Sequence, residues 1–319
     1  MLFAHERWFE FEPVSSDWDF VTESTTLWLL GGAVAITLLV RLIARRWPGV
    51  DVEFLERLVP WMPFAVRLHL AISMVGLLSL GYYLSPAMDL PKEWWSFLYG
   101  AVMVVVAITM AAGWHTRAGA ALLVVAGPLG AIAFGVMPVL SRLDLLGLAL
   151  FVLIAGPGRW SADVETARCA PTSPSEHARA IWWLKLAAGI ALIVVAFDEK
   201  LAVPDLAVAF LQEHPNFNVV DSLLGIEMEA REFARLAGAV EVLFGLLLIS
   251  GALPQVIVVV AAIPFNTTLW FFGTTELMGH LPVYVTLLAV LVYGSSPQFR
   301  PAVSALRPGY WPTRAPARP

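Results

Sequence analysis

The sequence predicts an all-α, polytopic membrane protein with about nine transmembrane helices: one N-terminal helix and two parallel four-helix bundle repeats. Three observations predict this fold, namely the composition, the spacing of the apolar runs and an internal repeat. Of the 319 residues, 59% are hydrophobic and only 14% are charged, whereas soluble domains are about 45–50% apolar and about 25% charged. Lipid must therefore solvate most of the surface. The net charge of −5 offers no basic face for nucleic acid.

The apolar runs have the length that a bilayer requires. A transmembrane helix needs about 20 consecutive apolar residues. Such runs are found near 26–44, 64–84, 97–113, 118–137, 140–156, 181–198, 234–251, 255–273 and 281–295. The fifth run is shortened by Arg142 and Asp144.

The basic residues predict the orientation. If the acidic N-terminus lies outside, 14 of the 20 Lys and Arg residues fall on the cytoplasmic side and 6 on the outer side. Cytoplasmic loops carry such an excess of basic residues. We therefore expect a multi-pass protein of the plasma (inner) membrane, with its N-terminus outside and its C-terminus in the cytoplasm.

Two segments of the chain resemble each other at an offset of 138 residues. Residues 100–104 match 238–242, and the glycines at 113, 135 and 156 match those at 251, 273 and 294. An even number of helices per repeat gives both units the same orientation. The predicted divisions are an acidic outer N-terminus with the leading helix (1–60), a degenerate first four-helix unit (61–160), a cytoplasmic linker (161–178), a second four-helix unit (179–297) and a Pro- and Arg-rich cytoplasmic tail (298–319).

Ionisable residues inside the apolar runs are the candidate functional residues. Glu241 lies about two turns into its helix, at a depth where a carboxylate is costly unless it faces a partner or water. Glu199 and Lys200 lie at the outer end of an earlier helix. We expect these three residues to handle protons as a cluster. The alternatives are a purely structural ion pair between Glu241 and Lys200, and a Lys200 that only caps its helix.

Four further polar residues of the second unit are candidates. Asn266 and Glu276 are expected to bind substrate together with His214, and His280 is expected to join the proton-handling group. Glu276 and His280 are spaced i, i+4, in a segment that resembles a short helical turn at the outer surface. A metal site needs three or four ligands, so this pair would need His214 as a third; we expect no metal. The first unit lacks these residues and is expected to be a scaffold.

The second unit resembles the DoxX/DoxD family of small four-helix membrane proteins. The motifs that carry the resemblance are a helix ending in FDEK, the later GAVEVLFGLLLISG, and FGTTELMGHLP before an apolar helix that ends in YG. The resemblance covers about residues 179–297 and implies a membrane subunit of a redox system, with Glu199, Lys200, Glu241, Gly279 and His280 at the family's motif positions. Family members include a subunit of an archaeal thiosulfate:quinone oxidoreductase. The fused first unit and the extra N-terminal helix depart from the family pattern.

The sequence thus favours a DoxX-like subunit that passes electrons from a small, sulfur-type substrate or a soluble or membrane redox partner to quinone at the outer face. No cofactor-binding motif is recognised, and quinone is the one cofactor that the resemblance implies. Two alternatives remain open. One is a non-enzymatic membrane anchor or scaffold for redox or metal-handling partners, and the other is a small-solute transporter.

Overall fold

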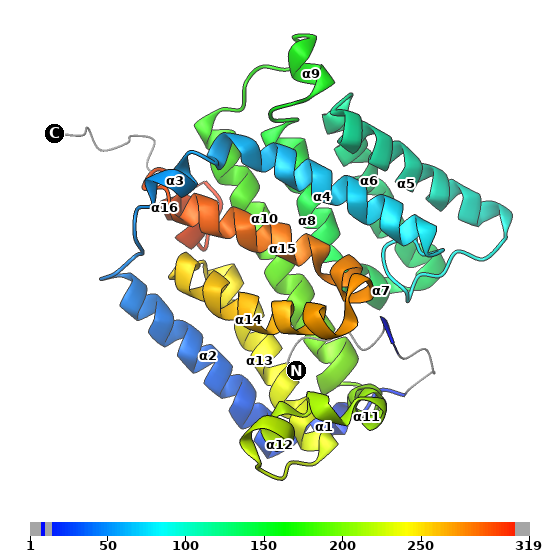
Figure 1. Ribbon diagram of the computed structural model, residues 1–319, viewed down its shortest axis with the longest axis vertical. Helices are drawn as coiled ribbons and strands as arrows, with labels where there is room; N and C mark the ends of the chain where they lie inside the picture. Colours follow the sequence, from blue (N-terminus) through cyan, green and yellow to red (C-terminus); the bar gives the residue numbers. More distant parts are fainter. Residues whose placement is uncertain (1–7, 10–14, 310–319) are drawn as a thin grey trace.

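The structure, a computed structural model, describes residues 8–9 and 15–309, except for the side chains at 223 and 274–276. The described chain is 76% helical and contains no β-strand. Eight of its helices are long and apolar enough to cross a membrane. These findings confirm the predicted all-α, multi-pass membrane fold (Figure 1).

The long helices follow the apolar runs of the sequence. They are α2 (Ser24–Ala44), α4 (Met62–Ser79), α5 (Trp94–Ala112), α6 (Thr116–Phe134), α10 (Pro174–Ala196), α13 (Ala230–Ser250), α14 (Pro254–Phe272) and α15 (Thr274–Gly294). Shorter helices connect them: α1 (Trp18–Thr22), α3 (Glu53–Glu56), η2 (Val59–Trp61), α7 (Val136–Leu140), α8 (Leu143–Ala155), α9 (Ala162–Glu165), η3 (Phe197–Leu201), α11 (Pro204–Glu213), η4 (Pro215–Phe217), α12 (Val219–Leu224) and α16 (Arg300–Ser304). We call the two ends of the bundle the α11 end and the α16 end.

The ninth expected span, 140–156, differs from the other eight. It is divided into α7, of five residues, and α8, of 13 residues. At about 1.5 Å per residue, α8 alone covers about 20 Å of a hydrocarbon core that is about 30 Å thick. The helices separate at Arg142, whose backbone (φ −111°, ψ 24°) is not helical. The break therefore falls at Arg142, one of the two charged residues that shorten the apolar run.

The helix boundaries show the internal repeat. The bounds of α6, residues 116 and 134, shift by 138 to give the bounds of α14, residues 254 and 272. The helices before them, α5 and α13, both end at a glycine with left-handed backbone: Gly113 has φ 62° and Gly251 has φ 59°. L-residues with a side chain rarely adopt this conformation, which makes glycine the usual residue there. The two units thus share the order α4–α5–α6–α7/α8 and α10–α13–α14–α15.

A buried cation occupies the α16 end of each unit. In the first unit, Arg67 on α4 donates to the carbonyls of Met110 on α5 and Trp160 beyond α8, both at 2.7 Å. In the second, Lys185 on α10 donates to the carbonyl of Ile249 on α13 (2.7 Å) and to one beyond α16 (3.0 Å). The last carbonyls of a helix lack partners within the helix, and a cation satisfies them favourably. The same device therefore fastens equivalent helices in both units.

The units pack through their first and fourth helices. The first helix of the second unit, α10, packs along α8, and the fourth, α15, packs along α4. The N-terminal helix α2 packs on α13 and lies at the edge of the molecule (Figure 1). Apolar side chains such as Leu38 and Leu42 on its outer face are more than half exposed, as expected for a surface that lipid covers.

Candidate functional site

The candidate site begins where α10 ends in a π-helical turn. This turn, η3, carries Glu199 and Lys200, and both side chains are buried. π-helical turns are rare and occur frequently at functional sites. The turn lies close against α13 because Gly238 has no side chain: a Cβ there would lie 2.7 Å from Leu201 and 3.2 Å from the Cβ of Lys200. Gly238 thus lets η3 approach the face of α13 that also carries Glu241, one turn further on.

Lys200 and Glu241 form an ion pair, as the sequence allowed. Their Nζ and Oε1 atoms lie 3.0 Å apart, and the two side chains are 2% and 3% exposed. Removing two charges from water costs several kcal/mol per ion, and the mutual attraction offsets this only in good geometry. Burying this ion pair therefore costs free energy, and removing one of its partners would cost more. Both a functional site and a purely structural ion pair, called a structural lock below, are consistent with this.

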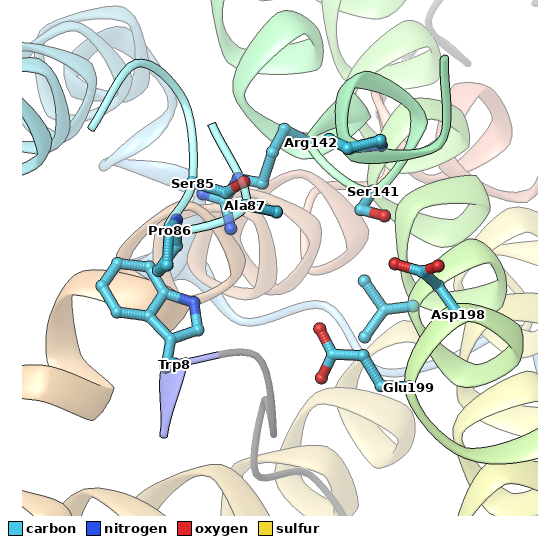
Figure 2. A pocket seen from close by; sticks show the side chains of 10 residues that line it. Trp8, Ser85, Pro86, Ala87, Ser141, Arg142, Asp198 and Glu199 are labelled. Carbon is cyan, nitrogen blue, oxygen red and sulfur yellow. The ribbon is translucent and has the colours of Figure 1, made fainter. Parts of the chain in front are cut away.

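A small cavity lies next to η3, between the two four-helix units. Asp198 and Glu199 line it from η3, and Ser141 and Arg142 line it from the segment between α7 and α8. Figure 2 shows these residues, with Trp8 and the turn at Ser85–Ala87 on the opposite side. The volume of about 20 Å³ is enough for one water molecule. A quinone ring does not fit in it.

The first unit thus contributes charged groups to the site, contrary to the expectation of a plain scaffold. Arg142 and Asp144 form an ion pair at 3.5 Å, and both side chains are about 95% buried. The sequence contained the signal, since ionisable residues within an apolar run are functional candidates by default. Sequence reasoning treated them only as a reason for a shorter span.

On its other side, Lys200 is covered by α11. A second cavity, of about 10 Å³, is lined by Lys200, Phe210 of α11 and Phe233 of α13. The segment between η3 and α13 folds as α11, η4 and α12, and α11 packs on α13 and η3. Within the described part of the chain, the short amphipathic helix α11 thus covers Lys200 at the α11 end.

The remaining candidates lie apart from this cluster. His214 ends α11 and contacts the rings of Phe210 and Phe272, with centroids at 5.0 and 5.3 Å. Asn266 is exposed on α14 and donates to the carbonyl of Ala262 in its own helix.

Of the expected outer-surface pair, Glu276 and His280, the structure describes the His280 side chain alone. His280 is fully buried inside α15, where its ring packs edge-on against Phe265 at 4.7 Å, instead of lying in a short surface turn. The side chain of Glu276 lies outside the described residues. Among those that are described, no group of three His, Cys, Asp or Glu could hold a metal ion.

Comparison of the chain with family models, with curated proteins and with solved structures finds no match. Asp198, Glu199 and Arg142 line a water-sized cavity between two helical units, and Lys200, the residue after Glu199, forms the ion pair with Glu241. Such a group can hold, release and relay protons.

Proposed function

We propose that the chain is an integral membrane subunit of a redox system, in which the cluster of Glu199, Lys200 and Glu241 relays protons at the outer face of the plasma (inner) membrane. The electrons come from a small, sulfur-type substrate or from a redox partner protein, and quinone accepts them. A quinone that accepts two electrons also takes up two protons, and the cluster supplies their path. The α11 end is the outer face in this proposal, and the C-terminus is cytoplasmic.

The observation that carries the proposal is the buried Lys200–Glu241 pair with Glu199 beside it at a water-sized cavity. Buried intramembrane charges mark proton relays and substrate paths. Because the cavity has room for a water molecule but not for a quinone ring, the cluster's part in this proposal is proton transfer only. The resemblance of residues 179–297 to the DoxX/DoxD family supports the redox setting.

The test must separate a proton relay from a structural lock. Breaking a buried pair by removing one partner costs about 3–5 kcal/mol, whereas replacing both partners by neutral residues is often tolerated. We therefore choose the double variant Lys200→Met/Glu241→Gln, with Glu232→Gln as control. Glu232 also lies on α13 but is half exposed and pairs with Arg235.

The measurement is thiosulfate-dependent reduction of a soluble quinone by membranes that contain the full chain. Wild type and Glu232→Gln should be active, and the double variant should accumulate to the wild-type level but lose about 10²-fold or more in rate, the contribution of a positioned acid or base. A fully active double variant would show that the pair is a structural lock and would favour the anchor or scaffold. A wild type that is inactive with thiosulfate, with other small sulfur compounds and with a co-purified partner protein as electron donor would remove the redox proposal.

A small-solute transporter is the second candidate, and one observation favours it. The charged cavity lies at the interface between two repeated units, where transporters built from repeats place their binding sites. Proteoliposomes loaded with a pH-sensitive dye would test it, because solute-driven proton flux is expected from a transporter and not from a redox subunit.

A further inference from the structure

A crevice of about 270 Å³ lies at the α16 end of the molecule, where the first unit joins the linker to α10. This volume is just below the range of about 300–1,000 Å³ that is typical of small-molecule sites. The walls are mainly apolar, with Pro60, Pro157 and Pro171 among the lining residues, and no Asp or Glu of the described chain lines the crevice. The crevice therefore suits a small molecule with an apolar body.

Close contacts hold the walls of the crevice in place. Gly158 has left-handed backbone (φ 68°), and a Cβ there would lie 2.7 Å from the Cβ of Pro63 and 2.8 Å from the amide nitrogen of Phe64. Glycine thus lets the turn after α8 lie directly against the start of α4. In the linker, the hydroxyl of Thr172 donates to the carbonyl of Ala155, at the end of α8. Because the fold fixes these walls, binding does not have to order them.

One buried side chain presents a hydrogen-bonding group to the crevice. His177, near the start of α10, is only 8% exposed and lines the crevice. Its Nδ1 lies 2.6 Å from the hydroxyl oxygen of Tyr293 on α15. The other ring nitrogen, Nε2, makes no hydrogen bond within the described residues but keeps accessible surface. Nε2 is therefore the atom that His177 offers to a ligand.

The tyrosine determines what Nε2 can bind. Tyr293 is fully buried, and in the described part of the chain its hydroxyl has His177 Nδ1 as its one hydrogen-bond partner. A buried hydroxyl whose proton has no acceptor is costly, so the hydroxyl of Tyr293 donates to Nδ1. In a neutral imidazole one nitrogen accepts and the other carries the proton. His177 thus presents an Nε2–H donor, which requires an acceptor on the ligand.

A cation adds a second donor. Arg159 also lines the crevice, and its guanidinium lies over the ring of Trp61, 4.7 Å from the ring centroid. Stacking on an aromatic ring restricts the guanidinium and leaves its edge available to a carboxylate. The crevice therefore combines a buried neutral donor with a stacked cation and has no acid among its described lining residues. This combination favours an anionic acceptor, because hydrogen bonds between charged groups are the stronger ones.

We propose that this crevice binds a small organic carboxylate. The carboxylate accepts a hydrogen bond from His177 Nε2 and is neutralised by Arg159, and the apolar body of the ligand lies against the proline side chains. An inorganic anion has no apolar part to fill these walls. The site lies at the opposite end of the bundle from the Lys200–Glu241 pair and does not depend on the proposed redox function.

The test is isothermal titration calorimetry on the full chain, purified in a non-ionic detergent. The probes are benzoate and hexanoate, and their amides, benzamide and hexanamide, are uncharged controls of nearly the same shape. Wild type should bind at least one of the carboxylates. The corresponding amide should bind about tenfold more weakly or worse, which is the difference expected when hydrogen bonds lose their charge.

Two arginine variants separate the site from the general charge of the linker. Arg159→Gln, at an exposed position, should weaken binding of the carboxylate by about tenfold. Its matched control is Arg168→Gln, because Arg168 is also exposed and lies between α8 and α10 but does not line the crevice. This control should bind like wild type.

His177→Phe tests the buried donor, since it keeps a ring but removes Nε2–H, and it should also weaken binding by about tenfold. If this variant does not fold, the amides and Arg159→Gln still decide the question. The proposal is wrong if neither carboxylate binds to wild type, if the amides bind as tightly, or if Arg168→Gln weakens binding as much as Arg159→Gln. It is also wrong if menadione, a neutral quinone, binds more tightly than both carboxylates.

Discussion

The close contact between α10 and α13 should control both the stability of the second unit and the geometry of its charged cluster. The two helices touch through glycines, and a Cβ on Gly245 would lie 2.7 Å from the carbonyl oxygen of Gly189 and 2.6 Å from Ile193. A backbone oxygen cannot move aside by rotating a side chain. Gly245→Ala must therefore push the helices apart, which also moves Lys200 relative to Glu241.

The size of the effect follows from two opposing contributions. Overpacking a close contact costs about 1–3 kcal/mol, and at a contact with the backbone we expect the upper part of this range. Alanine is a better helix former than glycine by about 1 kcal/mol. The net loss is about 1–2 kcal/mol, which lowers the unfolding temperature by roughly 2–8 °C in a domain of about 150–250 residues.

Thermal unfolding of the purified protein in detergent, followed by tryptophan fluorescence, measures this loss. The matched control is Gly31→Ala, since a Cβ on Gly31 meets nothing within 4 Å. It should leave the unfolding temperature unchanged or raise it slightly. If Gly245→Ala proves as stable as the control, the helices do not meet through their backbones and the reasoning fails.

Two further predictions concern the α16 end. Arg67→Met and Lys185→Met each leave helix-end carbonyls without a donor, so each should cost about 1–3 kcal/mol in thermal unfolding; a cost in only one unit would contradict the equivalence of the two cation sites. Asp163 accepts hydrogen bonds from the backbone and side chain of Thr116 and from the backbone of His115, at the start of α6. Burial alone would raise the pKa of Asp163, but these hydrogen bonds outweigh it and hold the pKa below its usual range. A depressed pKa stabilises the fold above the usual carboxyl range, and this stabilisation is lost as the pH falls through the depressed value. Asp163→Asn should therefore be less stable than wild type by about 1 kcal/mol at neutral pH, and the difference should shrink on acidification; a difference independent of pH would contradict this.

The spans could be predicted from the sequence because a bilayer imposes one simple condition, about 20 apolar residues in a row. The same condition explains why 140–156 was predicted to be one transmembrane helix, whereas the structure divides it into α7 and α8. Buried within the protein, and not facing lipid, Arg142 and Asp144 can pair and interrupt a helix at membrane depth. Composition along the chain does not reveal which neighbour shields such a break.

The charged cluster could be predicted only in part, for a related reason. Glu241 and Lys200 were visible as charges at helix positions, and the structure places them in contact. Arg142 comes to line one cavity with Glu199 through the packing of α8 on α10, a contact between units that no local pattern encodes. His280 shows the converse, since it was expected in a short surface turn but is buried within the continuous helix α15.

Because the two units are parts of one chain and differ in sequence, the two interfaces between them, α8–α10 and α4–α15, can also differ. Two identical units related by a twofold axis would bury the same side chains at both interfaces between their first and fourth helices. In this chain the α8–α10 interface includes Arg142 and Glu199 around a water-sized cavity. At the α4–α15 interface, Met278 fills the space beside Gly76, where a Cβ would lie 2.3 Å from its sulfur. One interface therefore provides an apolar contact that holds the units together, and the other can carry charges whose cost a symmetric pair of units would bear twice.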